Sequence, residues 1–414
     1  MRSRLRVLVS AYACVPGKGS EAGVGWNWVR QIARFHEVWV ITRANNREPI
    51  DAALAQDPMP NVHWSYFDLP RWARFWKKGH RGVRLYYFLW QFGAYFVARK
   101  LHQRVRFDLV HHVTFVIYWM PSFLALLPVP FVWGPVGGGE STPEAFRSTF
   151  TPRGKIYEAL RDVARSLGQA NPFVRLTARW AVLALATTDQ TARRLQALGC
   201  QRVFVYSEAG LPREEIRQLG SLGMRHGNPF RLVSIGNLLH WKGFELGLRA
   251  FAEFHYSFPA SEYWLIGEGP ERKRLERLAR QLGVADKVVF WGALPRQDVL
   301  GKLADCDALV HPSLHDSGGW VCLEAMAAGR PVICLDLGGP AVQVTEECGF
   351  KISPLSPNQT IEALAEAMLK LALNFDLRAG RGEAAQRRVS EYFSWDKKVH
   401  FVLELYNLAK AGVR

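Results

Sequence analysis

Acidic residues are scarce in this chain of 414 residues. It holds 37 aspartates and glutamates against 53 lysines and arginines, which gives a formal net charge of +16. So basic a balance indicates an anionic partner, and nucleic acid, an acidic membrane surface and phosphate-bearing substrates all qualify. The hydrophobic fraction of 49% excludes a disordered or fibrous chain and allows a large core. The length favours two domains.

Cysteine is also sparse, and the six residues of this type show neither paired nor metal-type spacing. We therefore expect reduced core thiols in a cytoplasmic protein. A long uninterrupted apolar run is missing as well, since Pro121, Pro128 and Pro130 divide the stretch from residue 113 to 133. That stretch favours a strand, a short helix and a strand over a membrane span. The apolar N-terminus is interpreted as a buried first strand.

Short apolar runs alternate with helical periods along the chain, which is typical of parallel sheets wrapped by helices. The expected strands are residues 5–12, 37–43, 107–113 and 130–136 in the first half and 230–237, 262–269, 287–294, 306–313 and 331–339 in the second. No internal repeat is evident. The sequence therefore predicts an α/β protein with two Rossmann-like, doubly wound parallel-sheet domains that face each other across a cleft, where such folds bind ligands.

The expected domain boundaries follow from the polar segment over residues 207–230, which is rich in Gly and Pro and is interpreted as a linker. The first domain then covers residues 1–206 and the second covers residues 207–395. A helix over residues 396–414, preceded by a serine at a capping position, is expected to cross back towards the first domain.

Two acids flank a glycine turn in residues 311–332, which read HPSLHDSGGWVCLEAMAAGRPV. Asp316 stands before the turn, and Glu324 lies more than one turn inside the helix expected after it. Helix N-termini have unpaired N–H groups that favour anions, and carboxylates so placed grip pairs of sugar hydroxyls. The segment indicates a site for a sugar linked to a nucleotide diphosphate. The alternative is that Asp316 only starts an Asx turn and Glu324 only forms an ion pair on the helix face.

Lys242 is a second candidate, because it precedes Gly243 where a strand gives way to a helix. A point-charge donor at that place suits a diphosphate, although a lone lysine is usually a solvated surface charge. A third candidate is the segment GKGSEAGVGWNW, residues 17–28, in which a glycine-rich loop is expected to lead into a helical segment that starts at Gly25. In it Gly23 and Gly25 would allow close backbone approach from the first domain, but the third glycine of a dinucleotide fingerprint is lacking.

Residues 265–339, from LIGEGPERK to LDLGG, resemble the second half of the glycosyltransferases of family 4, which are retaining enzymes with the two-domain GT-B fold. The resemblance runs through nearly the whole second domain and is looser in the first. The family has two acids separated by seven residues, and Asp316 and Glu324 keep that spacing, although the first acid is usually Glu. The family also pairs an Arg with a Lys five positions on as the diphosphate clamp; Lys242 matches the Lys, but Asn237 stands at the Arg position.

The resemblance implies roles for these residues. Glu324 would hold the ribose diol, while Asp316 would face the donor sugar and phosphates. The other donor-binding positions implied are Ser317, Gly318, Gly319, Trp320 and Val321 in the turn, with Trp291 and Leu294 near the nucleobase. The implied mechanism uses no metal or cofactor: helix amides and Lys242 stabilise the leaving diphosphate. Attack from the face of departure, with retained configuration, rests on the resemblance alone.

Family members also tend to carry a histidine after a strand like FDLVHHV, close to the reacting carbon. Here His111 and His112 are adjacent, and alternation along a strand permits only one to face the cleft. A histidine in a strand is otherwise a satisfied core or surface residue. The next strand leads into WGPVGGGE, residues 133–140, where Gly137, Gly138 and Glu140 are acceptor-side candidates and a plain flexible loop is the alternative.

The segment from Asp305 to Asp307 has the Asp-x-Asp form that metal-dependent sugar transferases use. It joins a helix to the amino end of the strand after it, away from the expected cleft, so we interpret it as a helix end and expect no metal site.

Residues 71–106 contain no acid and interleave Arg and Lys with Trp, Phe and Tyr. Such a segment suits the surface of an anionic membrane, where each basic residue contributes about 1 kcal/mol. That contact would bring the first domain to a lipid-linked acceptor. A core helix with a solvated basic face is the equal alternative, and binding of single-stranded nucleic acid is the third interpretation.

The sequence therefore predicts an enzyme that moves a sugar from a nucleotide-diphosphate donor to a glycan or lipid-linked acceptor, in the cytoplasm or at the inner face of its membrane. We expect no nucleic acid partner. A nonenzymatic basic module for membrane or nucleic acid would explain the charge but not the paired acids and Lys242. A glycoside hydrolase would also use two carboxylates, but it has no need of amides and a lysine directed at phosphate.

Overall fold

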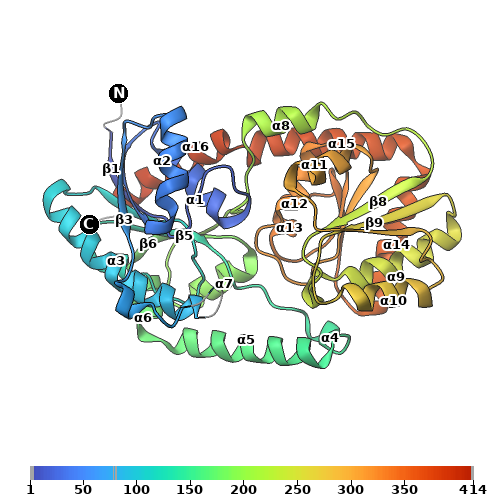
Figure 1. The fold of residues 1–414 in the computed structure, drawn as a ribbon, viewed down its shortest axis with the longest axis horizontal. Coiled ribbons are helices and arrows are strands. Elements are labelled where there is room, and N and C mark those ends of the chain that lie inside the picture. The colour runs from blue at the N-terminus through green and yellow to red at the C-terminus, as the bar shows by residue number, and fades with distance from the viewer. Residues whose placement is uncertain (1–3, 78, 80–81, 412–414) are drawn as a thin grey trace. The chain divides into compact units, whose positions relative to one another are not determined.

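The computed structural model describes residues 4–77, 79 and 82–411 (Figure 1). Its internal contacts divide the chain into two compact units. The first comprises residues 1–139, 161–208 and 395–414, and the second comprises residues 140–160 and 209–394. Helix α5 (Pro152–Ala170) begins in the second unit and ends in the first. The boundaries and the cleft expected from the sequence stay predictions.

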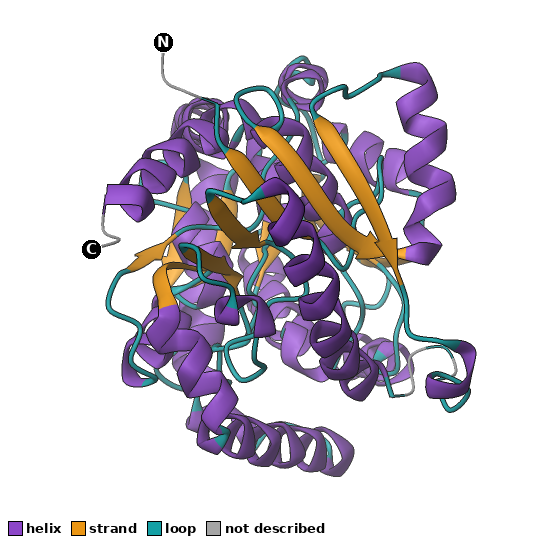
Figure 2. Ribbon diagram, turned by 90° about the vertical axis from the view of Figure 1, so that its left-hand side faces the viewer, coloured by secondary structure: helices purple, strands orange, loops and turns teal. Residues whose placement is uncertain are grey.

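The first unit contains a seven-stranded sheet in the order β3-β2-β1-β4-β5-β6-β7, and all its strand pairs are parallel. Figure 2 shows strands side by side with helices around them. The strands are β1 (Arg6–Ser10), β2 (Glu37–Arg43), β3 (Val62–Phe67), β4 (Leu109–His112), β5 (Phe131–Val136), β6 (Ala181–Ala186) and β7 (Val203–Val205). The helices are α1 (Ser20–Ile32), η1 (Ala44–Asn46), α2 (Arg47–Gln56), η2 (Arg71–Ala73), α3 (Val83–Val105), η3 (Phe123–Leu126), α6 (Pro172–Trp180), α7 (Asp189–Ala197) and α16 (Trp395–Ala411).

The second unit contains a six-stranded sheet in the order β10-β9-β8-β11-β12-β13, again with parallel pairs. Its strands are β8 (Phe230–Ile235), β9 (Ser261–Ile266), β10 (Val288–Gly292), β11 (Ala308–His311), β12 (Val332–Leu335) and β13 (Gly349–Ile352). Its helices are α4 (Glu144–Arg147), α8 (Arg213–Gly220), η4 (His240–Lys242), α9 (Phe244–Ser257), α10 (Arg272–Gln281), α11 (Arg296–Ala304), α12 (Trp320–Ala327), α13 (Gly338–Gln343), α14 (Pro357–Leu373), α15 (Phe375–Arg388) and η5 (Val389–Phe393).

Each sheet reverses its direction of winding between its first and fourth strands in chain order. In the first sheet this point lies between β1 and β4, and in the second it lies between β8 and β11. Loops that leave the carboxyl ends of two such neighbouring strands diverge to opposite sides of the sheet and leave room for a ligand. The loops after β8 and β11 are therefore the place to look for a site in the second unit.

The inner strands β4, β11 and β12 are fully buried, as expected where a sheet is covered on both faces. Some helices start where a polar side chain caps them: Ser356 accepts the N–H of Gln359 at α14, and Asn374 accepts the N–H of Leu377 at α15. Capping side chains and buried apolar runs therefore mark the start of these particular elements.

All nine strands expected from the sequence are present, as β1, β2, β4, β5 and β8 to β12. Four strands were missed: β3, β6, β7 and β13. In the segment over residues 113–133 the short helix η3 and the start of β5 are present as expected, but the strand before them, β4, already ends at His112. The expected linker, residues 207–230, is not wholly irregular, because it contains α8, whose Leu219 is buried. Among the described residues, no helix is both long enough and apolar enough to cross a lipid bilayer.

Candidate functional site

Lys242 and Asp316 leave the two strands that flank the reversal point of the second sheet. Lys242 ends η4, in the loop after β8, and Asp316 lies in the loop after the neighbouring strand β11. Gly243 follows in the left-handed conformation with φ of 68°, and a Cβ there would lie 1.9 Å from the carbonyl oxygen of Pro312. The two loops therefore touch through backbone, and only glycine fits between them.

Asp316 is the centre of a charged cluster. Its Oδ2 forms an ion pair with Lys242 Nζ and lies 3.1 Å from His311 Nε2, while its Oδ1 accepts the N–H groups of Gly318 and Gly319 at 3.3 and 3.4 Å. Burial alone would raise the pKa of this carboxyl, but the charge of Lys242 and the hydrogen bond from His311 hold it far below its usual range. Asp316 is therefore ionised and fixed from four directions.

The turn after Asp316 is held by helix α13, which follows β12. Gly339 N donates to Asp316 O at 2.7 Å, and Gln343 Nε2 donates to Gly318 O at 2.5 Å. Gly319 has a φ of 57° and caps α12, which starts at Trp320. The first N–H groups of such a helix have no intrahelical partner and attract negative charge. The predicted positions from Ser317 to Val321 thus lie at a helix N-terminus beside Lys242 and Asp316.

Glu324 lies inside α12 and shares an arginine with a second acid. Arg296, the first residue of α11, donates from Nη2 to Glu324 Oε1 at 2.6 Å and from Nη1 to Glu215 Oε2 at 3.1 Å. Burial raises the pKa of the Glu324 carboxyl, although the Arg296 guanidinium acts in the opposite direction. The two carboxylates thus share one cation, and Glu324 is a hydrogen-bonded acid rather than a solvated helix charge.

The two acids and the lysine lie around one turn of the second unit. Asp316 stands before the turn and pairs with Lys242, and Glu324 is in α12, which begins directly after the turn. Cys322 of the same helix is buried, which raises the pKa of its thiol well above the ordinary value. Whether the two acids and the lysine bind a donor in the implied roles stays a prediction.

The remaining donor-side candidates lie at the carboxyl ends of β8 and β10. Asn237 is exposed just after β8. Trp291 is half-buried in β10, edge-on to Trp264 with ring centroids 5.3 Å apart, and the Nζ of Lys302 lies 4.0 Å from its ring. Leu294 packs against the apolar core of that side of the sheet.

His111 and His112 are both core residues of the first unit. His111 Nδ1 lies 2.7 Å from Tyr406 Oη and its Nε2 lies 2.7 Å from Gly134 O. His112 Nε2 lies 3.0 Å from both Tyr87 Oη and Gln91 Nε2. Burial lowers the pKa of His111 to about 4 and that of His112 to about 3, so both are neutral near pH 7. His111 therefore fits the alternative of a satisfied core histidine, whereas His112 is a core histidine whose Nδ1 has no hydrogen-bond partner among the described residues.

Gly23 does not lie in a glycine-rich loop, and that expectation was wrong, whereas Gly25 lies in a helix as expected. Both are inside α1, which begins at Ser20. A Cβ on Gly23 would lie 1.9 Å from Lys18 O, and one on Gly25 would lie 2.1 Å from Ala13 O. The glycines therefore let the helix pack against the loop after β1, a structural reason for their small size.

The segment after β5 is held in place and is not a plain flexible loop. Gly137 N donates to Val116 O at 2.9 Å, and Gly139 O accepts from Arg165 Nη2 at 2.6 Å. Gly138 has a φ of 85°, and Glu140 is buried. An ordered, partly buried segment is compatible with a role at the acceptor, which stays a prediction.

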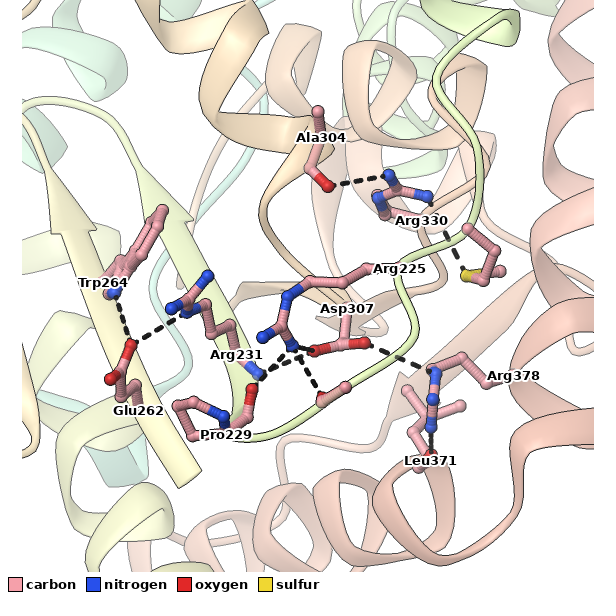
Figure 3. A network of polar contacts seen from close by, with 12 residues as sticks. Arg225, Pro229, Arg231, Glu262, Trp264, Ala304, Asp307, Arg330, Leu371 and Arg378 are labelled. Carbon is pink, nitrogen blue, oxygen red and sulfur yellow. Dashed lines mark hydrogen bonds and ion pairs between the residues drawn. The ribbon is translucent and has the colours of Figure 1, made fainter. Parts of the chain in front are cut away.

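Asp305 and Asp307 lie between α11 and β11, at the amino end of that strand, as expected. Figure 3 shows Asp307 surrounded by arginines. Its Oδ2 accepts from Arg231 N at 2.8 Å and from Arg225 Nη1 at 3.0 Å, and its Oδ1 lies 3.7 Å from Arg378 Nε. The carboxylate is thus engaged in fixing the amino edge of the sheet.

Sequence reasoning missed four polar residues of this site: His311, Arg296, Glu215 and Gln343. His311 could have been found, because it is the first residue of the quoted HPSLHD segment and ends a strand beside the site. Arg296 and Glu215 lie 81 residues apart, and Gln343 contacts a turn 25 residues before it. Pairings over such distances leave no local signal.

Comparison with protein families bears on the second unit. Residues 224–388 match the glycosyl transferases group 1. The D-inositol 3-phosphate glycosyltransferase of Corynebacterium jeikeium is 33% identical over 199 residues, which cover 45% of this chain and 46% of that protein. The lipopolysaccharide core biosynthesis glycosyltransferase LpsD of Rhizobium meliloti is 34% identical over 173 residues, covering 39% and 46%. The chain thus spans about half the length of these curated relatives, and the matches support a group 1 glycosyltransferase.

Solved structures bear on the whole chain. HepE of Anabaena in complex with UDP and glucose aligns with a TM-score of 0.58 at 18% identity, over 97% of this chain and 100% of that one. Sucrose-phosphate synthase of Thermosynechococcus elongatus aligns with a TM-score of 0.62 at 18% identity, over 99% and 100%. Likeness at this level of identity shows the fold, which is the GT-B fold with two Rossmann-like domains.

Proposed function

We propose that the chain is a retaining glycosyltransferase of family 4 that moves a hexose or related sugar from a nucleotide-diphosphate donor to a glycan or lipid-linked acceptor. The sugar would enter a polysaccharide or glycolipid. The observation that carries this proposal is the cluster of Lys242, Asp316 and the α12 N-terminus at the reversal point of the second sheet.

The chemistry of the cluster fits the transfer of a sugar from a diphosphate. Breaking the bond between the sugar and the diphosphate leaves negative charge on the phosphate oxygens, and a fixed ammonium with helix amides stabilises that charge without reorganisation. Asp316 holds Lys242 in place and offers its carboxylate to sugar hydroxyls. Glu324, kept in one position by Arg296, is available to the ribose diol. Retention of configuration rests on the family resemblance.

A panel of UDP-, GDP- and ADP-sugars in a thermal-shift assay tests the donor, followed by release of nucleoside diphosphate with candidate acceptors. We expect one donor to raise the melting temperature and Glu324→Ala to abolish the shift. Glu366→Ala, which removes an exposed acid of α14, is the matched control and should keep it. If no nucleotide sugar stabilises the protein, the donor assignment fails.

We also propose that the first unit touches an anionic membrane at the inner face, where it meets a lipid-linked acceptor. Tyr86, Tyr87 and Trp90 of residues 71–106 are buried, but four other aromatic side chains of that segment are exposed: Trp72 by 78%, Phe75 by 76%, Phe92 by 50% and Phe96 by 51%. Exposed basic residues of α3 accompany them, Arg84, Arg99 and Lys100 among them. A core helix with only a solvated basic face does not account for exposed aromatic rings.

Flotation with vesicles tests this contact. We expect the protein to bind phosphatidylglycerol vesicles at low salt and to dissociate as salt screens the attraction. The pair Phe92→Ala and Phe96→Ala should weaken binding, whereas Leu355→Ala, an exposed apolar residue of the second unit, should not. Equal binding to neutral phosphatidylcholine, or retention on single-stranded nucleic acid instead, contradicts the proposal.

A further inference from the structure

Glu158 of helix α5 is a buried acid that two histidines share. Its Oε1 lies 3.3 Å from His240 Nε2 and 3.2 Å from His315 Nε2. The side chains of Glu158, His240 and His315 are 3%, 12% and 9% exposed. Burial of a carboxylate is costly unless hydrogen bonds compensate it, so this arrangement needs a structural or functional reason.

The two histidines belong to the two loops that form the candidate site. His240 starts η4, which ends at Lys242, and His315 directly precedes Asp316. The same loops are joined by a backbone bond from Leu314 N to Trp241 O of 2.8 Å. Glu158 therefore contacts both the loop after β8 and the loop after β11, which carry Lys242 and Asp316.

Aromatic rings restrict both histidines further. The ring of Trp241 stacks between Tyr157 and His315, with centroids 5.1 and 5.2 Å away and interplanar angles of 12° and 13°. Phe150 meets His240 edge-on at 4.8 Å. Residues 150–158 thus support the loops with rings as well as with the carboxylate, and neither histidine can turn without disturbing the stack.

The geometry fixes the protonation of the two rings. Because a carboxylate oxygen only accepts, both histidines must carry a proton on Nε2. Removing the carboxylate would take away the acceptor that both buried rings share, and the lost hydrogen bonds favour rearrangement of the loops that carry them. A misplacement of about 1 Å in a catalytic group lowers turnover by about 100-fold.

We propose that Glu158 is a positioning residue, which sets the separation of Lys242 and Asp316 by holding His240 and His315. It touches neither donor nor acceptor and acts through the two loops. This inference rests on the proposed function, because the spacing of Lys242 and Asp316 matters for turnover only if these residues take part in sugar transfer.

Turnover by single-site variants of the full chain tests it. We expect Glu158→Ala to lower kcat by about 10- to 100-fold while the KM for the nucleotide sugar changes by less than about threefold, because Glu324 and the helix amides keep their places. Glu158→Gln retains an acceptor oxygen and should restore kcat to within about threefold of wild type. A variant Glu158→Ala with wild-type kcat overturns the proposal.

Asp307→Ala is the matched control for a merely structural role. Asp307 is an equally buried acid of the same unit, at the opposite edge of the sheet. It should lower the melting temperature but leave kcat of the folded enzyme unchanged. If Glu158→Ala lowers kcat no more than Asp307→Ala does, the positioning role is refuted.

A measurement without substrate keeps the inference separate from the proposed function. In the ¹⁵N-histidine NMR spectrum of the wild-type protein, His240 and His315, assigned by single substitution, should both carry the proton on Nε2. If no donor is turned over but both rings show this signature, the proposed function fails and the Glu158 contact stands. A ring protonated on Nδ1 alone overturns the inference whatever the activity.

Discussion

Strand β4 of the first unit and strand β11 of the second hold the same place in their sheets, next to the first strand of each. An aspartate precedes each strand and a histidine ends it four residues later: Asp108 and His112, then Asp307 and His311. Asp108 Oδ2 accepts the N–H of Arg6 in β1 at 2.8 Å, and Asp307 Oδ2 accepts the N–H of Arg231 in β8 at 2.8 Å. The two strands therefore have the same arrangement of an aspartate at the amino end and a histidine at the carboxyl end.

The partners that other elements supply are different. Asp108 has a side chain 26% exposed and pairs with Arg6, whereas Asp307 is 1% exposed and faces Arg225 and Arg378 as well. At the other end, His112 meets the neutral side chains of Tyr87 and Gln91, while His311 meets the Asp316 carboxylate. The same pair of residue types, an aspartate before the strand and a histidine at its end, therefore lies in a neutral core in the first unit and beside a charged site in the second.

Replacing Asp316 should have the largest effect, because it removes the carboxylate that distinguishes the surroundings of His311 from those of His112. Asp316→Asn leaves Lys242 and His311 without their carboxylate, and we expect kcat to fall by about 100- to 1000-fold, as for other charge-stabilising groups. Steady-state kinetics with the donor found by thermal shift measures the effect. Asp305→Asn, an exposed acid at the amino end of β11, should keep wild-type turnover. A loss below tenfold for Asp316→Asn would contradict the assigned site.

Removing the two aspartates that precede the strands should affect stability unequally. Asp307→Ala leaves buried arginines without their anion, so we expect it to cost about 3–5 kcal/mol. Asp108→Ala removes a partly exposed pair and should cost about 1 kcal/mol. Amide hydrogen exchange in β8 and β1 reports the local free energies of opening. Equal losses at the two positions would mean that burial does not distinguish them.

Acid should destabilise the first unit through His112. Burial lowers its folded pKa from 6.5 to about 3. As the pH falls below 6.5, the unfolded chain binds the proton and the folded chain does not, so stability is lost at about 1.4 kcal/mol per pH unit. His112→Gln removes this titration. Urea denaturation between pH 6.5 and 4 should therefore show a shallower loss for the variant, and parallel slopes would rule out a neutral buried histidine.

The smallest effect is expected from placing a basic residue at position 237, in the loop after β8 that carries Lys242. Asn237 is exposed, so Asn237→Arg should add an unburied charge near Lys242 that contributes up to about 1 kcal/mol. That corresponds to a gain of up to about fivefold in affinity for the nucleoside diphosphate, which calorimetry measures. Asn358→Arg, placed at the start of α14, controls for net charge. An equal gain from both would show that the position is irrelevant.

Much of the second unit could be predicted because its signals are local. The strand over residues 306–313, the glycine turn and the helix that ends before Gly329 are contiguous, so the places of Asp316 and Glu324 followed from apolar runs and turn residues. Lys242 was found for the same reason. Strands such as β6, AVLALA, were missed because short alanine-rich runs suit helices as well as strands.

What could not be predicted depends on contacts between distant residues. The partners of Glu324, the fixing of His111 by Tyr406 and the two contacts of Glu158 join residues 28 to 295 positions apart. Gly23 was placed in a loop instead of α1, because its small size serves the packing of α1 against the loop that precedes it. A glycine that fits a ligand and a glycine that fits a carbonyl look the same in sequence.

The contact of Gly243 with Pro312 has a consequence for engineering. Since no side chain fits there, the segment after β8 and the segment after β11 form one packed unit, and Glu158 of α5 contacts both of them. Anyone who grafts a relative's loop to alter sugar preference should transplant both segments together with residues 150–158; exchanging a single loop would produce a steric mismatch before it produced a new specificity.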